Sequence, residues 1–169
     1  MHIHHSHDFE TSPPAAPAQI GTRCVCTAVR RVDRLLNRVY DEALRPSGLA
    51  TTQYALLSTL SRAGRPVPHG ELAAMQEMAG TTLSRNLKPL VRDGLVRIEP
   101  GDDRRTRYVA ITERGESVLE EARPLWRSVQ ERVVAEVGEE WVERLLGELC
   151  EVLGQLRAAG SHAGDRSRP

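Results

Sequence analysis

The chain has 169 residues, of which 40% are hydrophobic, and its 23 basic and 23 acidic side chains give a formal net charge of zero. This length suits one domain, or a small domain with additional helices, and the balanced charge argues against indiscriminate binding to polyanions. No apolar run is long enough to span a membrane and no secretory signal is visible, so we expect a cytoplasmic protein without a membrane partner.

The two ends of the chain, residues 1–21 and 159–169, are predicted to be disordered tails. The first ten residues are rich in histidine, and a segment rich in Pro and Ala follows. The histidines resemble a metal site only in composition, and we interpret them as a cloning remnant or as part of the tail. Neither a metal site nor a cofactor is predicted.

Cysteine usage also argues against a structural role for metal or disulfides. Cys24, Cys26 and Cys150 are an odd number in a chain without an export signal, so a disulfide framework is not expected. The Cys24-Val25-Cys26 spacing is not that of a zinc ribbon, and no second close pair completes four ligands.

Apolar side chains that recur at steps of three and four residues predict a first helix over residues 23–45, within a dimerisation segment 22–50. A second helix is expected at residues 52–62, after a break at Pro46. The proline-rich residues 65–68 permit only a short edge strand against a later hairpin. The recurring apolar positions of the first helix are Val25, Val29, Val32, Leu36, Val39 and Ala43.

Two helices separated by a tight turn are predicted next, at residues 69–75 and 81–92, and together they form a helix-turn-helix unit. Thr81 could supply the cap of the second helix. One face of this helix is apolar, and the opposite face carries hydroxyl and basic side chains that can reach phosphate oxygens or base edges. The apolar face comprises Leu83, Leu87, Leu90 and Val91, and the polar face comprises Thr81, Arg85, Lys88 and Arg92.

A β-hairpin with a basic tip is predicted directly after this helix. Two β-rich runs, residues 95–98 and 107–111, flank a polar loop. The guanidinium groups of the tip suit phosphates or a narrow minor groove, and Asp103 is expected to orient one of them through a carboxylate pair. The arginines of the tip are Arg104, Arg105 and Arg107.

Two further helices complete the chain, from Thr112 to about Val137 and over residues 139–158. Pro124 lies inside the first of them and is expected to kink it. The last helix carries an apolar seam, as the first helix of the chain does, and two such seams are more than one small monomer can cover. We therefore predict a homodimer in which the segments 22–50 and 113–158 pack against a second copy. An intramolecular bundle is the alternative.

The chain resembles the MarR family of bacterial winged helix-turn-helix regulators over roughly residues 22–158. The resemblance implies a mainly α fold with a small β-hairpin wing, in which residues 51–112 form the winged helix-turn-helix domain. It also implies a homodimeric transcription factor, most often a repressor, that binds a pseudopalindromic operator in double-stranded DNA of the nucleoid. The motifs that carry it are Thr81-Thr82-Leu83-Ser84-Arg85-Asn86-Leu87, Asp93-Gly94-Leu95-Val96, Asp103-Arg104-Arg105 and Ile111-Thr112-Glu113-Arg114-Gly115.

Charge along the chain fits this interpretation, because residues 81–107 have an excess of basic side chains and residues 113–151 an excess of glutamate. We expect the recognition helix to contact the major groove and the wing to contact the minor groove. The predicted DNA-binding residues are Thr81, Thr82, Ser84, Arg85, Lys88, Arg92, Arg104, Arg105 and Arg107.

The resemblance further implies release from the operator by a small molecule, often an aromatic acid. An arginine of the first helix could oppose its carboxylate, and tyrosine or histidine side chains could donate hydrogen bonds to it. The effector-binding candidates are Arg34, Arg38, Tyr40, Tyr54 and His69.

Redox sensing at Cys24 or Cys26 is an alternative mode of regulation. Several positions follow intervals similar to those in organic-peroxide sensors of the OhrR type, and a helix N-terminus with nearby arginines favours a thiolate. Arg30 and Thr51, however, stand where those sensors present tyrosines.

Two other classes of protein fit this sequence less well than a DNA-binding regulator does. No nucleophile with a base, acid pair or metal cluster predicts an enzyme, and His69 beside Glu71 suits a hydrogen-bonding role. A winged helix that binds protein would expose apolar side chains on the recognition face, where this chain has Thr81, Arg85 and Lys88.

Overall fold

The computed structural model describes residues 24–101, 103 and 106–165, with only the backbone described for residues 160–165. The predicted N-terminal tail, residues 1–21, lies outside the described residues. The described chain divides into two compact units, with the boundary between Arg38 and Val39. Its elements are α1 (Val25–Leu44), a 3-10 turn (Arg45–Ser47), α2 (Thr51–Ala63), β1 (Val67–Pro68), α3 (His69–Met75), α4 (Gly80–Arg92), β2 (Val96–Pro100), β3 (Arg107–Ile111), α5 (Glu113–Val137) and α6 (Glu139–Asp165).

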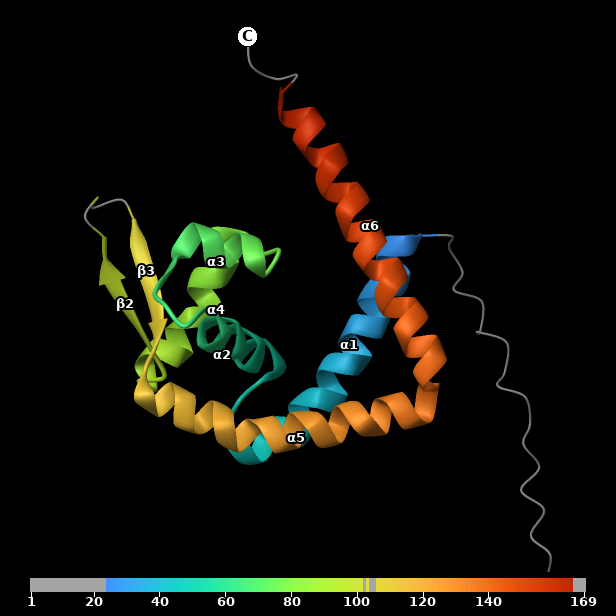
Figure 1. Ribbon diagram of the computed structural model, residues 1–169, viewed down its shortest axis with the longest axis horizontal. Helices are drawn as coiled ribbons and strands as arrows, with labels where there is room; N and C mark the ends of the chain where they lie inside the picture. Colours follow the sequence, from blue (N-terminus) through green and yellow to red (C-terminus); the bar gives the residue numbers. More distant parts are fainter. Residues whose placement is uncertain (1–23, 102, 104–105, 166–169) are drawn as a thin grey trace, which may run out of the picture. The chain divides into compact units, whose positions relative to one another are not determined.

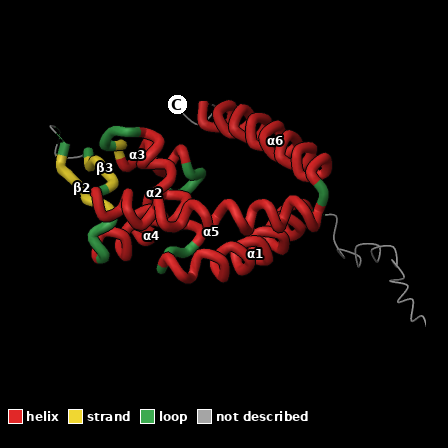
Figure 2. Tube along the Cα trace, turned by 60° about the horizontal axis from the view of Figure 1, so that its bottom comes forward, coloured by secondary structure: helices red, strands yellow, loops and turns green. Residues whose placement is uncertain are grey.

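The mainly helical fold with a small antiparallel sheet confirms the predicted fold class (Figure 1). The strands have the order β1-β3-β2, and β2 pairs with β3 in the hairpin expected from the sequence. The short strand β1 pairs with β3 through Val67 and Val109, so the proline-rich segment is the predicted edge strand. Figure 2 shows the short helices α2, α3 and α4 beside the strands.

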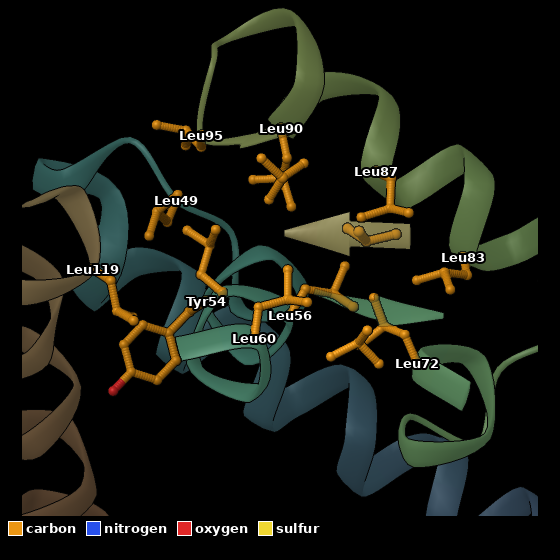
Figure 3. Close-up of a cluster of buried hydrophobic side chains, with 14 of the residues drawn as sticks. Leu49, Tyr54, Leu56, Leu60, Leu72, Leu83, Leu87, Leu90, Leu95 and Leu119 are labelled. Carbon is orange, nitrogen blue, oxygen red and sulfur yellow. The ribbon is translucent and has the colours of Figure 1, made fainter. Parts of the chain in front are cut away.

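The helices α2, α3 and α4 and the three strands form a winged-helix lobe. Its core is built from leucines that α2, α3 and α4 direct toward one another and toward the sheet (Figure 3). Burial of such side chains is the main source of stability of a small domain, at roughly 1.5–3 kcal/mol for each one that is fully buried. The fully buried leucines are Leu44, Leu56, Leu57, Leu60, Leu72, Leu83, Leu87, Leu90 and Leu119.

The start of α2 is held by Asp41 of α1. One carboxylate oxygen of Asp41 accepts hydrogen bonds from the backbone N and from Oγ1 of Thr51, both at 2.6 Å. The side-chain oxygen of Gln53 accepts a bond from the backbone N of Ala50 at 2.8 Å. These bonds satisfy backbone groups that a helix leaves free at its N-terminus.

The hairpin joins α5 through a tight junction at Thr112 and Gly115. The hydroxyl of Thr112 accepts a bond from the backbone N of Gly115 at 3.0 Å and donates to the carbonyl of Gly94 at 2.7 Å. A Cβ at Gly115 would lie 2.1 Å from the carbonyl oxygen of Leu95, so only glycine fits here. The helix α5 continues through Pro124 as one element, and the kink expected at this proline stays a prediction.

The last helix, α6, extends to Asp165, beyond residue 158 where the sequence predicted its end and the start of a disordered tail. Ala158 and Ala159 are strong helix formers, and they carry the helix past that point. Among the described residues, no helix combines the length and apolar character needed to cross a membrane.

Candidate nucleic-acid interface

The helix α4 is amphipathic, and its apolar face holds it against the core. Leu83, Leu87 and Leu90 are fully buried, as the sequence predicted. Val91 was assigned to the same face but is 41% exposed, because it lies at the edge of the apolar face and borders a surface cavity. The helix begins at Gly80 after Ala79, without a side-chain cap, so Thr81 does not supply the cap that the sequence allowed.

The turn before α4 sets the direction in which this helix leaves α3. Glu77 has a φ of 50°, the one non-glycine residue with positive φ among those described. The backbone N of Met78 donates to the carbonyl of Ala73 at 2.9 Å, and Asn86 of α4 contacts the sulfur of Met78 at 3.6 Å. These contacts fix α4 relative to α3 as a helix-turn-helix unit requires.

The opposite face of α4 is open to solvent. Thr81, Ser84, Arg85 and Lys88 are exposed, and Thr82 is half-buried. Among the described residues, no carboxylate lies within ion-pair distance of Arg85 or Lys88. Both cations are therefore available to an anionic partner such as the phosphate backbone of DNA.

Arg92 differs from these cations because it is paired with Asp93. Its Nε and Nη2 atoms donate to the two carboxylate oxygens of Asp93 at 2.8 and 3.2 Å. The hydrogen bond from Arg92 holds the pKa of Asp93 below its usual value. A phosphate would compete with this carboxylate for Arg92, and we therefore expect a weaker DNA contact than the sequence suggested.

A surface cavity of about 860 Å³ lies between α4, the start of α3 and the hairpin. Its lining combines apolar side chains with three basic ones, a combination that suits a partner with both aromatic and anionic character. His69 lies at its edge, where Nε2 is 3.0 Å from the Oγ atom of Ser84. The cavity is lined by Pro68, His69, Gly70, Ser84, Leu87, Lys88, Val91, Arg92, Ile98, Thr106 and Arg107.

Arg107 is the first residue of β3, and it is exposed and lies beside this cavity. The loop closes through backbone bonds from Thr106 to Asp103 at 2.8 Å and from Gly101 to Thr106 at 2.9 Å. The predicted contacts Arg104 and Arg105 lie outside the described residues, and the proposed pairing of Asp103 with an arginine stays a prediction.

Two of the effector candidates, Tyr40 and Tyr54, are buried around Trp126. The rings of Tyr54 and Trp126 are stacked, with centroids 4.4 Å apart, and Tyr40 lies 4.6 Å from Trp126. The hydroxyl of Tyr40 donates to Gln130 at 2.5 Å, and burial raises the pKa of both tyrosines. In this structure the indole of Trp126 thus occupies the space between the two tyrosines.

The remaining candidates lie on α1. Arg34 and Arg38 are exposed, as are Cys24 and Cys26, and both thiols are free. A hydrogen bond from the side chain of Thr27, supported by its backbone, lowers the pKa of Cys24. That effect favours the thiolate, which is the reactive form of cysteine.

The contact between His69 and Ser84 was missed by sequence reasoning. The two residues are 15 positions apart on different helices, and no local pattern connects them. Sequence reasoning also missed the pairing of Arg92 with Asp93, although the adjacent opposite charges could have indicated it.

Comparisons with known proteins agree with this architecture. Residues 47–106 match the model of the MarR family. The transcriptional regulator MosR of M. tuberculosis, solved in complex with DNA, is 41% identical and superposes with a TM-score of 0.69, covering 79% of this chain and 98% of that one.

Two curated relatives are more distant. The uncharacterized HTH-type transcriptional regulator YwoH of Bacillus subtilis is 28% identical over 63% of this chain and 77% of its own length. The transcriptional activatory protein BadR of Rhodopseudomonas palustris is 29% identical over 73% of each chain. With the helix-turn-helix, the hairpin and these likenesses, the chain belongs to the MarR family of transcriptional regulators and is not an enzyme.

Proposed function

We propose that this protein is a sequence-specific, homodimeric regulator that binds double-stranded operator DNA through α4 and the hairpin. The observation that carries the proposal is the exposed face of α4, where Arg85 and Lys88 stand without carboxylate partners among the described residues. Its relative MosR was solved in complex with DNA, which supports the same role here. The protein would act in the cytoplasm, on DNA of the nucleoid.

Each exposed side chain of α4 has a role that follows from its chemistry. Arg85 can read guanine through its two parallel donors, and Lys88 suits a phosphate or a guanine acceptor. Thr81, Thr82 and Ser84 can donate to phosphate oxygens or contact a thymine methyl. At the wing, Arg105 would enter the minor groove, while Arg104 and Arg107 would contact phosphates and Asp103 would orient one of them.

Selection of bound sequences from random duplex DNA tests this proposal. An enriched inverted repeat with half-sites about one helical turn apart would support a dimer with two α4 helices in successive major grooves. If no sequence is enriched, the proposal fails. Fixed salt is essential, because phosphate contacts make affinity strongly dependent on ionic strength.

The homodimer is supported by apolar side chains that the single chain leaves exposed on α1 and on α6. Trp141, for example, is 46% exposed, and large apolar side chains seldom gather on a surface that faces only water. On α6 the exposed apolar residues are Trp141, Leu146, Leu149, Val152, Leu153 and Leu156.

A charge placed on this surface is expected to separate the subunits. Leu149→Glu would bury a carboxylate among apolar side chains, which is costly without a partner. We expect sedimentation equilibrium to show a dimer for the wild type and a monomer for the variant at the same concentration, with operator binding also lost. Glu148→Gln, at the neighbouring exposed position, is the control and should stay dimeric; a dimeric Leu149→Glu variant would contradict the proposed surface.

We expect that the protein represses transcription and that a small molecule, such as an aromatic acid, releases it from the operator. The cavity beside α4 supports this mode of release, because its lining includes Lys88 and Arg107, which can oppose a carboxylate, together with apolar side chains. A panel of aromatic carboxylates titrated into the operator complex tests it. A reporter gene under the selected operator tests the sign, and activation would align the protein with BadR instead.

Redox control is the second candidate, and the exposed Cys24 thiol with its lowered pKa favours it. The thiolate would attack the O–O bond of a peroxide, so that sulfur is oxidised to a sulfenic acid and the peroxide is reduced to an alcohol or water. We expect peroxide to weaken operator binding by the wild type and by Cys150→Ser. Of Cys24→Ser and Cys26→Ser, the variant that lacks the reacting thiol should keep its operator binding in the presence of peroxide. Equal peroxide sensitivity in all four proteins would remove this candidate.

A further inference from the structure

His69 lies where it can control a hydroxyl on the DNA-facing side of α4. Its Nε2 atom is 3.0 Å from Oγ of Ser84, and a Cβ built on Gly80 would lie 3.6 Å from its Cε1 atom. The imidazole therefore rests against the first turn of α4, next to the hydroxyl that is proposed to contact DNA. His69 is only half-buried, so protons from solvent can reach it.

We propose that His69 is a positioning residue that orients the Ser84 hydroxyl for DNA and, by taking up a proton, strengthens operator binding as the pH falls. The inference rests on the proposed DNA contact of Ser84. It adds a residue that need not touch DNA itself, and a solution condition to which the affinity responds.

The physical basis is the single proton of the Ser84 hydroxyl. When neutral imidazole accepts at Nε2, that proton is used by His69 and Ser84 presents only lone pairs to DNA. When the imidazole is charged, Nε2–H donates to Ser84, and the hydroxyl proton is free to donate to a phosphate oxygen or a base acceptor. Phosphate oxygens are acceptors, so the charged state suits the complex.

The charged groups around His69 are also consistent with tighter DNA binding at lower pH. Lys88 and Arg92 of α4 and Arg107 of β3 line the same cavity, while Glu71 of α3 is held by Arg65 at 2.6 Å. No carboxylate therefore lies free beside the imidazole among the residues that the structure describes. The anion that would accompany a charged His69 is the phosphate that DNA brings, so proton uptake and DNA binding support each other.

The test measures affinity for the selected operator duplex between pH 5.5 and 8 at constant ionic strength. We expect wild-type affinity to rise as the pH falls, by up to about tenfold per pH unit for each subunit, the limit for uptake of one proton. His69→Gln keeps a donor for Ser84 at every pH but cannot titrate, so it should show a flat profile, with an affinity near that of the wild type at low pH and above that of the wild type at high pH. His69→Ala should bind more weakly than His69→Gln throughout, by about tenfold for a lost hydrogen bond.

Controls separate this role from a structural one. His162→Gln, and replacement of His2, His4, His5 and His7 together, should leave the wild-type pH profile in place. In a double-mutant cycle, Ser84→Ala should remove most of the effect of His69→Ala, because one residue acts through the other.

Several outcomes would overturn the inference. A wild-type slope retained in His69→Gln excludes His69 as the titrating group, and additive effects of His69→Ala and Ser84→Ala exclude positioning. If Ser84→Ala binds the operator as tightly as the wild type, Ser84 does not contribute to binding and His69 cannot act by positioning it. The enriched operator would still support DNA binding by α4. Failure to enrich any duplex is a different result, since it removes the proposed function itself.

Discussion

Replacing Gly115 with alanine is expected to destabilise the winged-helix lobe by roughly 3 kcal/mol or more, at the upper end of the cost of overpacking. The added Cβ would lie 2.1 Å from the carbonyl oxygen of Leu95 and 2.8 Å from Cγ1 of Ile111. The first neighbour is backbone, which no rotamer change can move away. Relief would require β2 and α5 to separate, and that movement would also break the bonds of the Thr112 hydroxyl.

Denaturant unfolding at one fixed protein concentration measures this effect, because the stability of a dimer depends on concentration. Gly70→Ala is the matched control. Nothing lies within 4 Å of a Cβ at Gly70, and alanine is favoured over glycine inside a helix, so stability should be unchanged or raised by up to about 1 kcal/mol. A Gly115→Ala protein that unfolds at the wild-type midpoint would show that the junction is not closely packed.

The helix-turn-helix could be predicted from the sequence because its signals are local. Leucines at helical spacing identified the buried face of α4, and they are buried as expected. The β-rich runs on either side of a polar loop identified the hairpin, and β2 and β3 pair there. Periodicity of this kind depends only on neighbours in the chain, so it needs no knowledge of the tertiary structure.

Contacts between distant segments could not be predicted in this way. Periodicity placed Val91 on the apolar face of α4 but could not show that this edge of the helix borders a cavity. Tyr40 and Tyr54 were candidates for an open pocket, yet Trp126, far away in the sequence, stacks on one and lies against the other. The bond between His69 and Ser84 likewise depends on how α3 meets α4.

The two arginines on the polar face of α4 differ in whether a carboxylate is paired with them, and for Arg92 the adjacent aspartate in the sequence could have indicated this. Arg92 has Asp93 within 2.8 Å, whereas no carboxylate among the described residues is paired with Arg85. A guanidinium that is already paired gives less when it meets DNA, because the carboxylate must first be displaced. The structure therefore ranks Arg85 as the stronger candidate for reading a base.

Arg85→Ala is expected to weaken binding to the selected operator by about 1–3 kcal/mol per half-site and to relax the preference at one base position. Affinity for random duplex should fall much less, so the ratio of specific to non-specific affinity is the decisive measurement. Arg92→Ala should lower the affinity for the operator and for random duplex by a similar factor, which should be smaller than the effect of Arg85→Ala on the operator. Arg127→Ala removes the same charge from an exposed position of α5 and should change neither. If Arg85→Ala lowers both affinities equally, Arg85 contacts phosphate; the base readout must then come from other residues of α4, with Lys88 the next to replace.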